Sequence, residues 1–300
     1  MNHMLRNLIY FICPFASNDE WRKNVIALKK YWAIFNGKKI ISISVGHGLC
    51  EASEVESYVG FNDVEFIHVD NCEKLGEVVA FVPVLERVYS LNDTEISFYA
   101  HAKGVTPGKS VEELEAEEIW RNLMYVYCLS DSIKIDAILS HYACAGTFAK
   151  YGTHHLPMPV KWHFSGTFFW FNHKQLFSKN WRKIENNRYG VEGYLPLFFE
   201  EKNMFCLFGD NPNHSNLYRY KLNDWLQFYN FEKNYAQESG EEYSLEYTSY
   251  IVKKIEKCRD YDELDLFMRK EGLTLDDINK WEHTIDDING VWKKYCKKKN

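Results

Sequence analysis

Apolar and polar positions in the first third of the chain form two alternating kinds of segment. Short runs that are apolar almost throughout predict buried strands, and the segments between them carry apolar residues at helical spacing. The predicted strands are residues 8–13, 38–45, 64–70 and 95–102, and the predicted helices are residues 20–35, 51–59 and 75–89. This repeated alternation favours an α/β fold, with a mostly parallel sheet and helices on both of its faces.

The pattern is less regular in the second third of the chain. A long helix is predicted over residues 111–129, with the acidic start that the helix dipole favours. Residues 136–149 are ambiguous, because residues 143–146 fit either a helix or a short strand. The run Trp162–Phe171 is apolar on both faces and predicts one strand with a glycine inside it. Further along we expect a helical turn over residues 173–177, a helix near residues 194–200 and a strand over residues 204–208.

Domain organisation follows from a shift in composition near residue 211. Asn, Tyr and charged residues dominate from there to residue 240, and several helical patterns follow. We therefore expect an α/β domain over residues 1–210, a linker or irregular segment over residues 211–240 and a helical region over residues 241–300. The basic residues near its end leave open a peripheral contact with an anionic membrane surface.

Composition and charge narrow the class of protein. The net charge of −6 argues against a general nucleic-acid binder, which is usually basic. The 16% of aromatic residues fits either an aromatic core or a surface that stacks on flat ligands. Eight scattered cysteines without a CxxC pair suit free thiols in a reducing cytoplasm better than a zinc site or a disulfide framework. No apolar segment reaches the roughly 20 residues of a membrane span, so we expect a soluble, cytoplasmic protein with no transmembrane segment.

Candidate chemistry gathers where the fourth predicted strand ends. His101 and Lys103 are two positions apart, so on a strand their side chains share a face. Open α/β sheets bind ligands at the carboxyl ends of their strands, and two potential cations there indicate an anionic ligand, above all a diphosphate. The alternative is a strand that merely runs into a polar turn at Gly104. The usual phosphate loops, GxGxxG after the first strand and GxxxxGK[ST], do not occur in the sequence.

Four segments, taken in order, resemble GT-A-type glycosyltransferases. They are the strand, loop and helix over residues 11–32, the strand end His101-Ala102-Lys103-Gly104, the block Phe164–Phe171 and the segment Gly190–Gly193. The chain is most similar to the group typified by rhamnan-synthesis and related polysaccharide-building proteins, and the resemblance covers about residues 7–210. It implies a GT-A-like (Rossmann-like) domain that moves a sugar from a nucleotide-sugar donor to a saccharide or another hydroxyl acceptor, which is a hexosyltransferase-like activity.

The chain departs from that family at one place. The family usually ends the central strand with Asp-x-Asp, whose carboxylates hold a divalent metal on the diphosphate of the donor, whereas this chain has His101-Ala102-Lys103. Hard cations prefer oxygen ligands, and a protonated lysine coordinates no metal. We therefore expect no required cofactor and direct diphosphate binding by Lys103 and His101. The alternative is a Mn²⁺ or Mg²⁺ ion held by Asp70 and a second acid.

The resemblance also implies roles for the candidate residues. Glu192 is similar to the acid that takes the proton from the acceptor hydroxyl in inverting enzymes, and aromatic neighbours would raise its pKa toward that work. A plain surface glutamate is the alternative. Lys103 and His101 complete the catalytic set. The residues implied in donor binding are Pro14, Phe15, Ser17, Asn18, Asp70, Gly104, Gly166 and Thr167, and those in acceptor binding are Trp170, Tyr189 and Tyr194.

Several of these residues have an alternative, purely structural explanation, and the function of the whole chain has an alternative as well. Core packing is the alternative for Trp170, helix capping for Asp70, and relief of crowding in the sheet for Gly166. The competing class of protein is a non-catalytic saccharide-binding or assembly protein that keeps the fold after losing Asp-x-Asp. Donor binding that depends on Lys103 would separate an enzyme or a nucleotide-binding relic from a pure scaffold.

Overall fold

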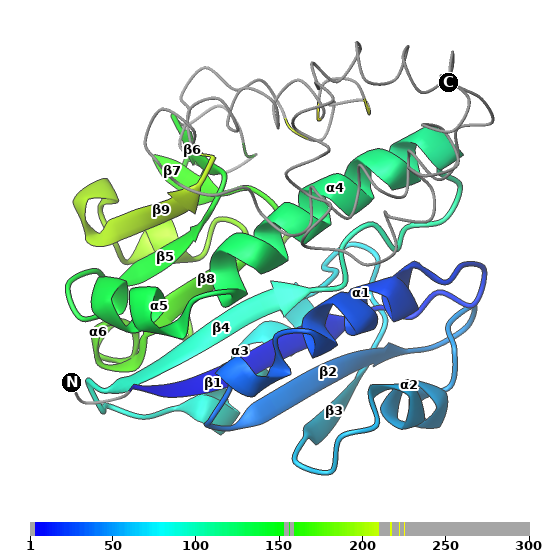
Figure 1. Cartoon of the computed structure of the whole chain (residues 1–300), viewed down its shortest axis with the longest axis horizontal. Coiled ribbons are helices and arrows are strands. Elements are labelled where there is room, and N and C mark those ends of the chain that lie inside the picture. Colours follow the sequence, from blue (N-terminus) through cyan, green and yellow to red (C-terminus); the bar gives the residue numbers. More distant parts are fainter. Residues whose placement is uncertain are drawn as a thin grey trace, which may run out of the picture. The chain divides into compact units, whose positions relative to one another are not determined.

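The computed structural model describes residues 4–152, 156, 159–209, 217, 222 and 225 (Figure 1). The chain divides into two compact units, Met1–Tyr220 and Lys221–Asn300. Most of the first unit is described, and of the second unit only residues 222 and 225. Apart from isolated positions, the predicted linker over residues 211–240 and the predicted helical region over residues 241–300 lie outside the described residues.

A seven-stranded sheet forms the centre of the first unit. Its strands are β1 (Leu5–Ile12), β2 (Lys39–Val45), β3 (Glu65–Asp70), β4 (Glu95–His101), β5 (Cys144–Thr147), β8 (Phe169–Asn172) and β9 (Met204–Phe208). They lie in the order β3-β2-β1-β4-β8-β5-β9. β1 to β4 are parallel to one another, β8 runs antiparallel between β4 and β5, and β9 is parallel to β5. The predicted mostly parallel α/β sheet is confirmed.

Helices cover both faces of this sheet, as in the Rossmann-like class. They are α1 (Glu20–Lys29), α2 (Ala52–Val59), α3 (Val78–Val88), α4 (Val111–Leu129), α5 (Ser132–Leu139) and α6 (His173–Phe177). In Figure 1, α1 and α4 lie on the face toward the viewer and α3 lies behind the sheet. α4 has the predicted bounds, and a capping box formed by Ser110 and Glu113 fixes its start. Within the described residues, no helix combines the length and the apolar character that crossing a bilayer requires.

The core between sheet and helices is strongly aromatic. Its fully buried side chains include Trp21, Trp120, Trp162, Trp170, Tyr10, Tyr99, Tyr125 and Tyr194. Each such ring buries about 150–250 Å², so aromatic residues contribute a large share of the apolar surface removed from water. Of the two explanations for the aromatic content, core packing accounts for these residues.

The run Trp162–Phe171 contains two strands, and the prediction of a single strand was wrong. β7 (Trp162–Phe164) pairs with β6 (Ala149–Tyr151) in a separate two-stranded antiparallel sheet, whereas β8 enters the main sheet. Gly166 and Thr167 lie between them with φ values of 91° and 62°. Strand backbone requires negative φ, so the chain turns here. The pattern hid the turn because both strands are buried throughout.

Two predicted helices are shorter than expected, and the ambiguous segment is a strand. The helix predicted over residues 20–35 ends at Lys29, and a 3₁₀ turn, Trp32–Ile34, follows it. The helix predicted near residues 194–200 is a 3₁₀ turn, Leu195–Leu197. Residues 143–146 overlap β5, where pairing with β8 and β9 determines the strand conformation.

Candidate functional site

The carboxyl end of β4 lies at the switch point of the sheet. β2 and β3 lie on one side of β1, and β4 lies on the other. His101, the last residue of β4, pairs in register with Phe11 of β1, and the N–H of Ala102 donates to the Phe11 carbonyl oxygen at 2.8 Å. Open α/β sheets bind ligands beyond the strand ends at such a point. The segment from His101 to Lys103 therefore occupies the position at which this class of fold holds its ligands.

Lys103 carries a buried positive charge just beyond β4. The residue is 6% exposed, and its ammonium lies 4.0 Å from the centre of the Trp120 ring. Burial lowers the pKa of Lys103 to about 8, while the Glu192 and Glu117 carboxylates oppose that shift. The side chain therefore keeps most of its charge at neutral pH.

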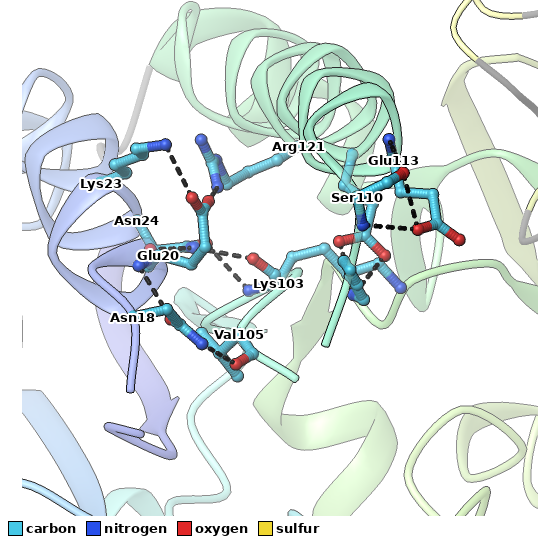
Figure 2. A network of polar contacts seen from close by, with 11 residues as sticks. Asn18, Glu20, Lys23, Asn24, Lys103, Val105, Ser110, Glu113 and Arg121 are labelled. Carbon is cyan, nitrogen blue, oxygen red and sulfur yellow. Dashed lines mark hydrogen bonds and ion pairs between the residues drawn. The ribbon is translucent and has the colours of Figure 1, made fainter. Parts of the chain in front are cut away.

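Asn24 of α1 holds the backbone of Lys103 (Figure 2). It is fully buried, its amide group donates to the Lys103 carbonyl oxygen at 2.8 Å, and its Oδ1 accepts from the Lys103 N–H at 2.8 Å. In the same network, Glu20 of α1 and Arg121 of α4 form a buried ion pair with a separation of 3.3 Å. Asn18 donates to the carbonyl oxygen of Val105 at 2.9 Å. Side chains of α1 and of the loop before it thus fix the loop that follows β4.

His101 is a neutral hydrogen-bonding group. Its Nδ1 lies 3.2 Å from Oε2 of Glu77, and its side chain is 23% exposed. Burial, with the Lys103 charge as a second cause, lowers the pKa of His101 to about 3. Of the two potential cations at this strand end, only Lys103 is therefore charged, because a largely buried imidazole beside an ammonium group stays unprotonated at neutral pH.

Glu77, the residue before α3, is a buried carboxyl group in the same cluster. Its Oε2 accepts a hydrogen bond from the Tyr99 hydroxyl at 2.9 Å, and the Thr167 side chain also bonds to it. Burial raises the pKa of Glu77 to about 7, the Tyr99 hydrogen bond opposes this shift, and the charge of Glu192 adds to it. Glu77 therefore exchanges its proton near neutral pH.

Glu192 connects the segments Phe164–Phe171 and Gly190–Gly193 with this cluster. It is 7% exposed, so the alternative of a plain surface glutamate is excluded. Its Oε1 accepts from the N–H of Gly166 at 3.2 Å and lies 3.9 Å from Nε2 of His163. Gly166 has φ 91°, and a Cβ there would lie 2.8 Å from the sulfur of Met124, so only glycine fits. The turn after β7 thus presents a backbone donor to the carboxylate.

Thr167 adopts a backbone conformation that its side chain disfavours. Its φ is 62°, in the left-handed region, where a β-branched residue is a genuine outlier. Such conformations cost on the order of 1–3 kcal/mol and occur where the surrounding structure enforces them, often at functional sites. Here the hydrogen bond to Glu77 holds the side chain in the cluster.

The other residues implied in donor binding differ in their exposure and in their position along the sheet. Pro14 is buried, Phe15 and Asn18 are partly exposed, and Ser17 is exposed, all after the end of β1. Gly104 has φ 82°, and a Cβ there would lie 2.7 Å from Oε2 of Glu117. Asp70 is exposed at the end of β3, the edge strand, which β2 and β1 separate from β4. It does not cap a helix, because α3 begins at Val78 after Glu77.

Two of the three residues implied in acceptor binding lie in the core. Trp170 has no exposed surface, and its indole N–H donates to the Cys128 carbonyl oxygen at 2.8 Å. Tyr194 is also fully buried, and its hydroxyl donates to the carbonyl oxygen of Trp181 at 2.5 Å. A ring without exposed surface has no face for a sugar, so the core alternative applies to Trp170, and Tyr194 likewise packs in the core. Tyr189, which is 42% exposed, has such a face.

Sequence reasoning missed Asn24 and Glu77. Asn24 lies among the apolar residues of α1 that pack inward, such as Trp21 and Val25, and a polar residue on a buried helix face was the available signal. Glu77 precedes an apolar helix, where an acid is ordinarily explained by the helix dipole. No local sequence pattern distinguishes an acid that interacts with the helix dipole from an acid that belongs to a functional site.

No group of three or more His, Cys, Asp or Glu side chains in the described part of the chain is arranged to hold a metal ion. Asp70 therefore belongs to no such group of three or more among those residues.

Neither a family model nor a curated protein matches the sequence. Among solved structures, the chain is similar to a 4-diphosphocytidyl-2C-methyl-D-erythritol synthase from Anaerococcus prevotii, with 8% identity, a TM-score of 0.35, and coverage of 70% of this chain and 90% of that one. It is also similar to a "putative nucleotide-diphospho-sugar transferase" from Desulfovibrio desulfuricans, with 13% identity, a TM-score of 0.31, and coverage of 64% and 73%. At such TM-scores these likenesses carry no argument about the activity of this chain.

Proposed function

We propose that this protein is a glycosyltransferase of the hexosyltransferase type, which moves a sugar from a nucleotide-sugar donor to a saccharide or another hydroxyl acceptor. One observation carries the proposal. Lys103 and His101 at the end of β4 and Glu192 from a distant loop belong to one buried cluster at the switch point of a mostly parallel sheet. A cation, a neutral imidazole and a carboxylate are the groups that such a transfer needs.

The proposed role of Lys103 is to stabilise the departing nucleoside diphosphate. When the bond between the anomeric carbon and the diphosphate oxygen breaks, negative charge builds up on that oxygen, and a fixed cation in a water-poor site lowers its energy. Lys103 is charged at neutral pH and is held from behind by Asn24. Its ammonium would supply the charge that Asp-x-Asp enzymes obtain from a metal, with the neutral His101 adding a hydrogen bond.

The proposed role of Glu192 is to take the proton of the acceptor hydroxyl. In an inverting reaction, the acceptor oxygen bonds to the anomeric carbon on the face opposite the diphosphate, and the proton resides on the carboxylate. The N–H of Gly166 orients that carboxylate, and His163 lies beside it. On the acceptor side, Tyr189 is the aromatic residue with a face to offer, and Pro14, Phe15, Ser17, Asn18 and Asp70 stay as proposed donor contacts.

A thermal-shift screen tests this function. The protein would be heated with UDP, GDP, CDP, dTDP, ADP and their sugars, with EDTA or with Mn²⁺. Ligand at 100 times its dissociation constant stabilises a folded protein by about 2.7 kcal/mol, which gives a measurable shift. We expect one nucleotide class to raise the melting temperature of the wild type in EDTA and to have little effect on Lys103→Met.

The control variant is Lys23→Met, which removes an outward lysine of the same network. It should respond to nucleotide as the wild type does. A shift that requires Mn²⁺ would refute direct diphosphate binding by Lys103 while keeping the transferase. No shift with any nucleotide would favour the non-catalytic binding or assembly protein.

A further inference from the structure

Arg188 differs from every other described arginine in having no charged partner. Within residues 4–152 and 159–209, the remaining arginines all form ion pairs with acids; they are Arg6, Arg22, Arg87, Arg121 and Arg182. Arg188 is exposed and forms no hydrogen bond or ion pair with any described residue. In a chain of net charge −6, an arginine without an acid beside it is available for an external anion.

The position of Arg188 is at the switch point of the sheet. A Cβ on Gly76, in the segment between β3 and α3, would lie 3.9 Å from Cγ of Arg188. Burial raises the pKa of Cys13 to about 11 and lowers that of His101 to about 3, and the positive charge of Arg188 contributes a small decrease at both groups. Gly76 directly precedes Glu77, whose Oε2 lies 3.2 Å from Nδ1 of His101 at the end of β4, so Arg188 lies near the strand end at which the strand order reverses.

Arg188 and Lys103 provide complementary kinds of positive charge. Lys103 is buried against Trp120 and is partly neutralised by carboxylates, whereas Arg188 is exposed. A guanidinium stays charged at any physiological pH and presents a planar set of donors that matches two phosphate oxygens at once. His101 is neutral and adds no charge to theirs.

We propose that Arg188 binds the diphosphate of the nucleotide ligand from the solvent side, through two guanidinium N–H groups, while Lys103 faces it from the core. This inference rests on the proposed function, since it assigns a new residue to the same site. Arg188 and Glu192 belong to the same loop between α6 and Leu195, so this one loop would contact the diphosphate with Arg188 and the acceptor with Glu192.

Calorimetric titration of the full chain with inorganic pyrophosphate tests the inference directly. Arg188→Gln should raise the dissociation constant about 10–100-fold, because a charge-assisted bidentate contact is lost. Arg188→Lys keeps a point charge without the fork, so an intermediate loss is expected. The matched control is Arg182→Gln, which removes a cation of the same segment that pairs with Glu86 and should leave the constant unchanged.

The inference is overturned if Arg188→Gln binds pyrophosphate as the wild type does, if Arg182→Gln loses as much affinity, or if the wild type does not bind pyrophosphate. Turnover of nucleotide sugars, measured in parallel, separates it from the proposed function. Binding that depends on Arg188 without any turnover would keep the anion site and refute the transferase. Turnover with an unchanged KM in Arg188→Gln would keep the transferase and refute the anion site.

Discussion

The two ends of β4 carry similar groups of side chains with different surroundings. At its amino end, the Asn7 side chain donates to Oε1 of Glu95 at 2.9 Å, and the Ser97 hydroxyl lies 2.7 Å from Nε2 of His173. At its carboxyl end, Tyr99 and His101 contact Glu77 in a comparable way. Burial lowers the pKa of both His101 and His173 to about 3.

The difference lies in charge and access. His173 is fully buried and Asn7 is saturated by neighbours, so the amino end is closed. At the carboxyl end, the His101 side chain is 23% exposed, Lys103 is charged, and Arg188 faces solvent without a partner among the described residues. A buried histidine beside a glutamate is therefore no mark of a site by itself. Position at a strand's carboxyl end, together with an exposed arginine that has no ion-pair partner among the described residues, is what distinguishes one end from the other.

Among substitutions that test this contrast between the two ends of β4, the largest expected effect is on turnover. Glu192→Gln should lower kcat by about 10²–10⁴-fold, because the amide accepts no proton from the acceptor hydroxyl. The matched control is Glu95→Gln, an equally buried carboxyl group at the other end of β4. It should lower the free energy of unfolding and leave the kcat of the folded protein unchanged. Equal kcat in wild type and Glu192→Gln would remove the proposed base.

Asn7→Ala should cost about 2–3 kcal/mol of unfolding free energy, measured by urea denaturation. The substitution leaves the buried Glu95 carboxylate and the Lys38 N–H without their Asn7 partner, and a buried unsatisfied polar group costs about 1–3 kcal/mol. Nucleotide affinity of the folded variant should match the wild type. A clear loss of affinity would mean that the amino end of β4 is coupled to ligand binding.

Asn24→Ala is the counterpart at the carboxyl end, because this asparagine is buried just as completely. It removes both hydrogen bonds to the Lys103 backbone and should cost about 2 kcal/mol of unfolding free energy. Here we also expect a roughly 10-fold weaker nucleotide affinity, because the loosened loop no longer holds the Lys103 ammonium in its binding position. Unchanged affinity would show that Asn24 supports the fold alone.

The most gradual effect is a slope of stability with pH that depends on Glu77. The unfolded carboxyl group ionises near 4.5 and the folded one at about 7, so unfolding releases a proton between those values. Raising the pH from 4.5 to 7 should therefore destabilise the wild type relative to Glu77→Gln, by at most about 1.4 kcal/mol per pH unit. The two neutral histidines act in the opposite direction below pH 6.5 in both proteins, so the difference between the two curves reports the loss of the Glu77 carboxyl group together with its contact with His101. Parallel curves for the two proteins would refute the raised pKa.

The parts of the fold that sequence patterns predicted correctly depend on contacts close along the chain. β1 to β4 and the helices between them follow from runs of apolar residues and their spacing, and β9 and α4 have their predicted bounds. Ser110 and Glu113 fix the start of α4 within one turn of helix. The predicted place of Lys103 and His101, at a strand end, follows from the same local order.

What the sequence by itself determined is therefore the α/β alternation and the candidate residues at the end of the fourth strand. The tertiary structure decided which partners those residues have. It divided Trp162–Phe171 into two strands at Gly166 and Thr167, buried Trp170, neutralised His101 beside Lys103, and brought Asn24, Glu77 and Arg188 to the site. The physical reason is that desolvation and charge depend on neighbours from distant segments, which periodicity along one segment does not encode.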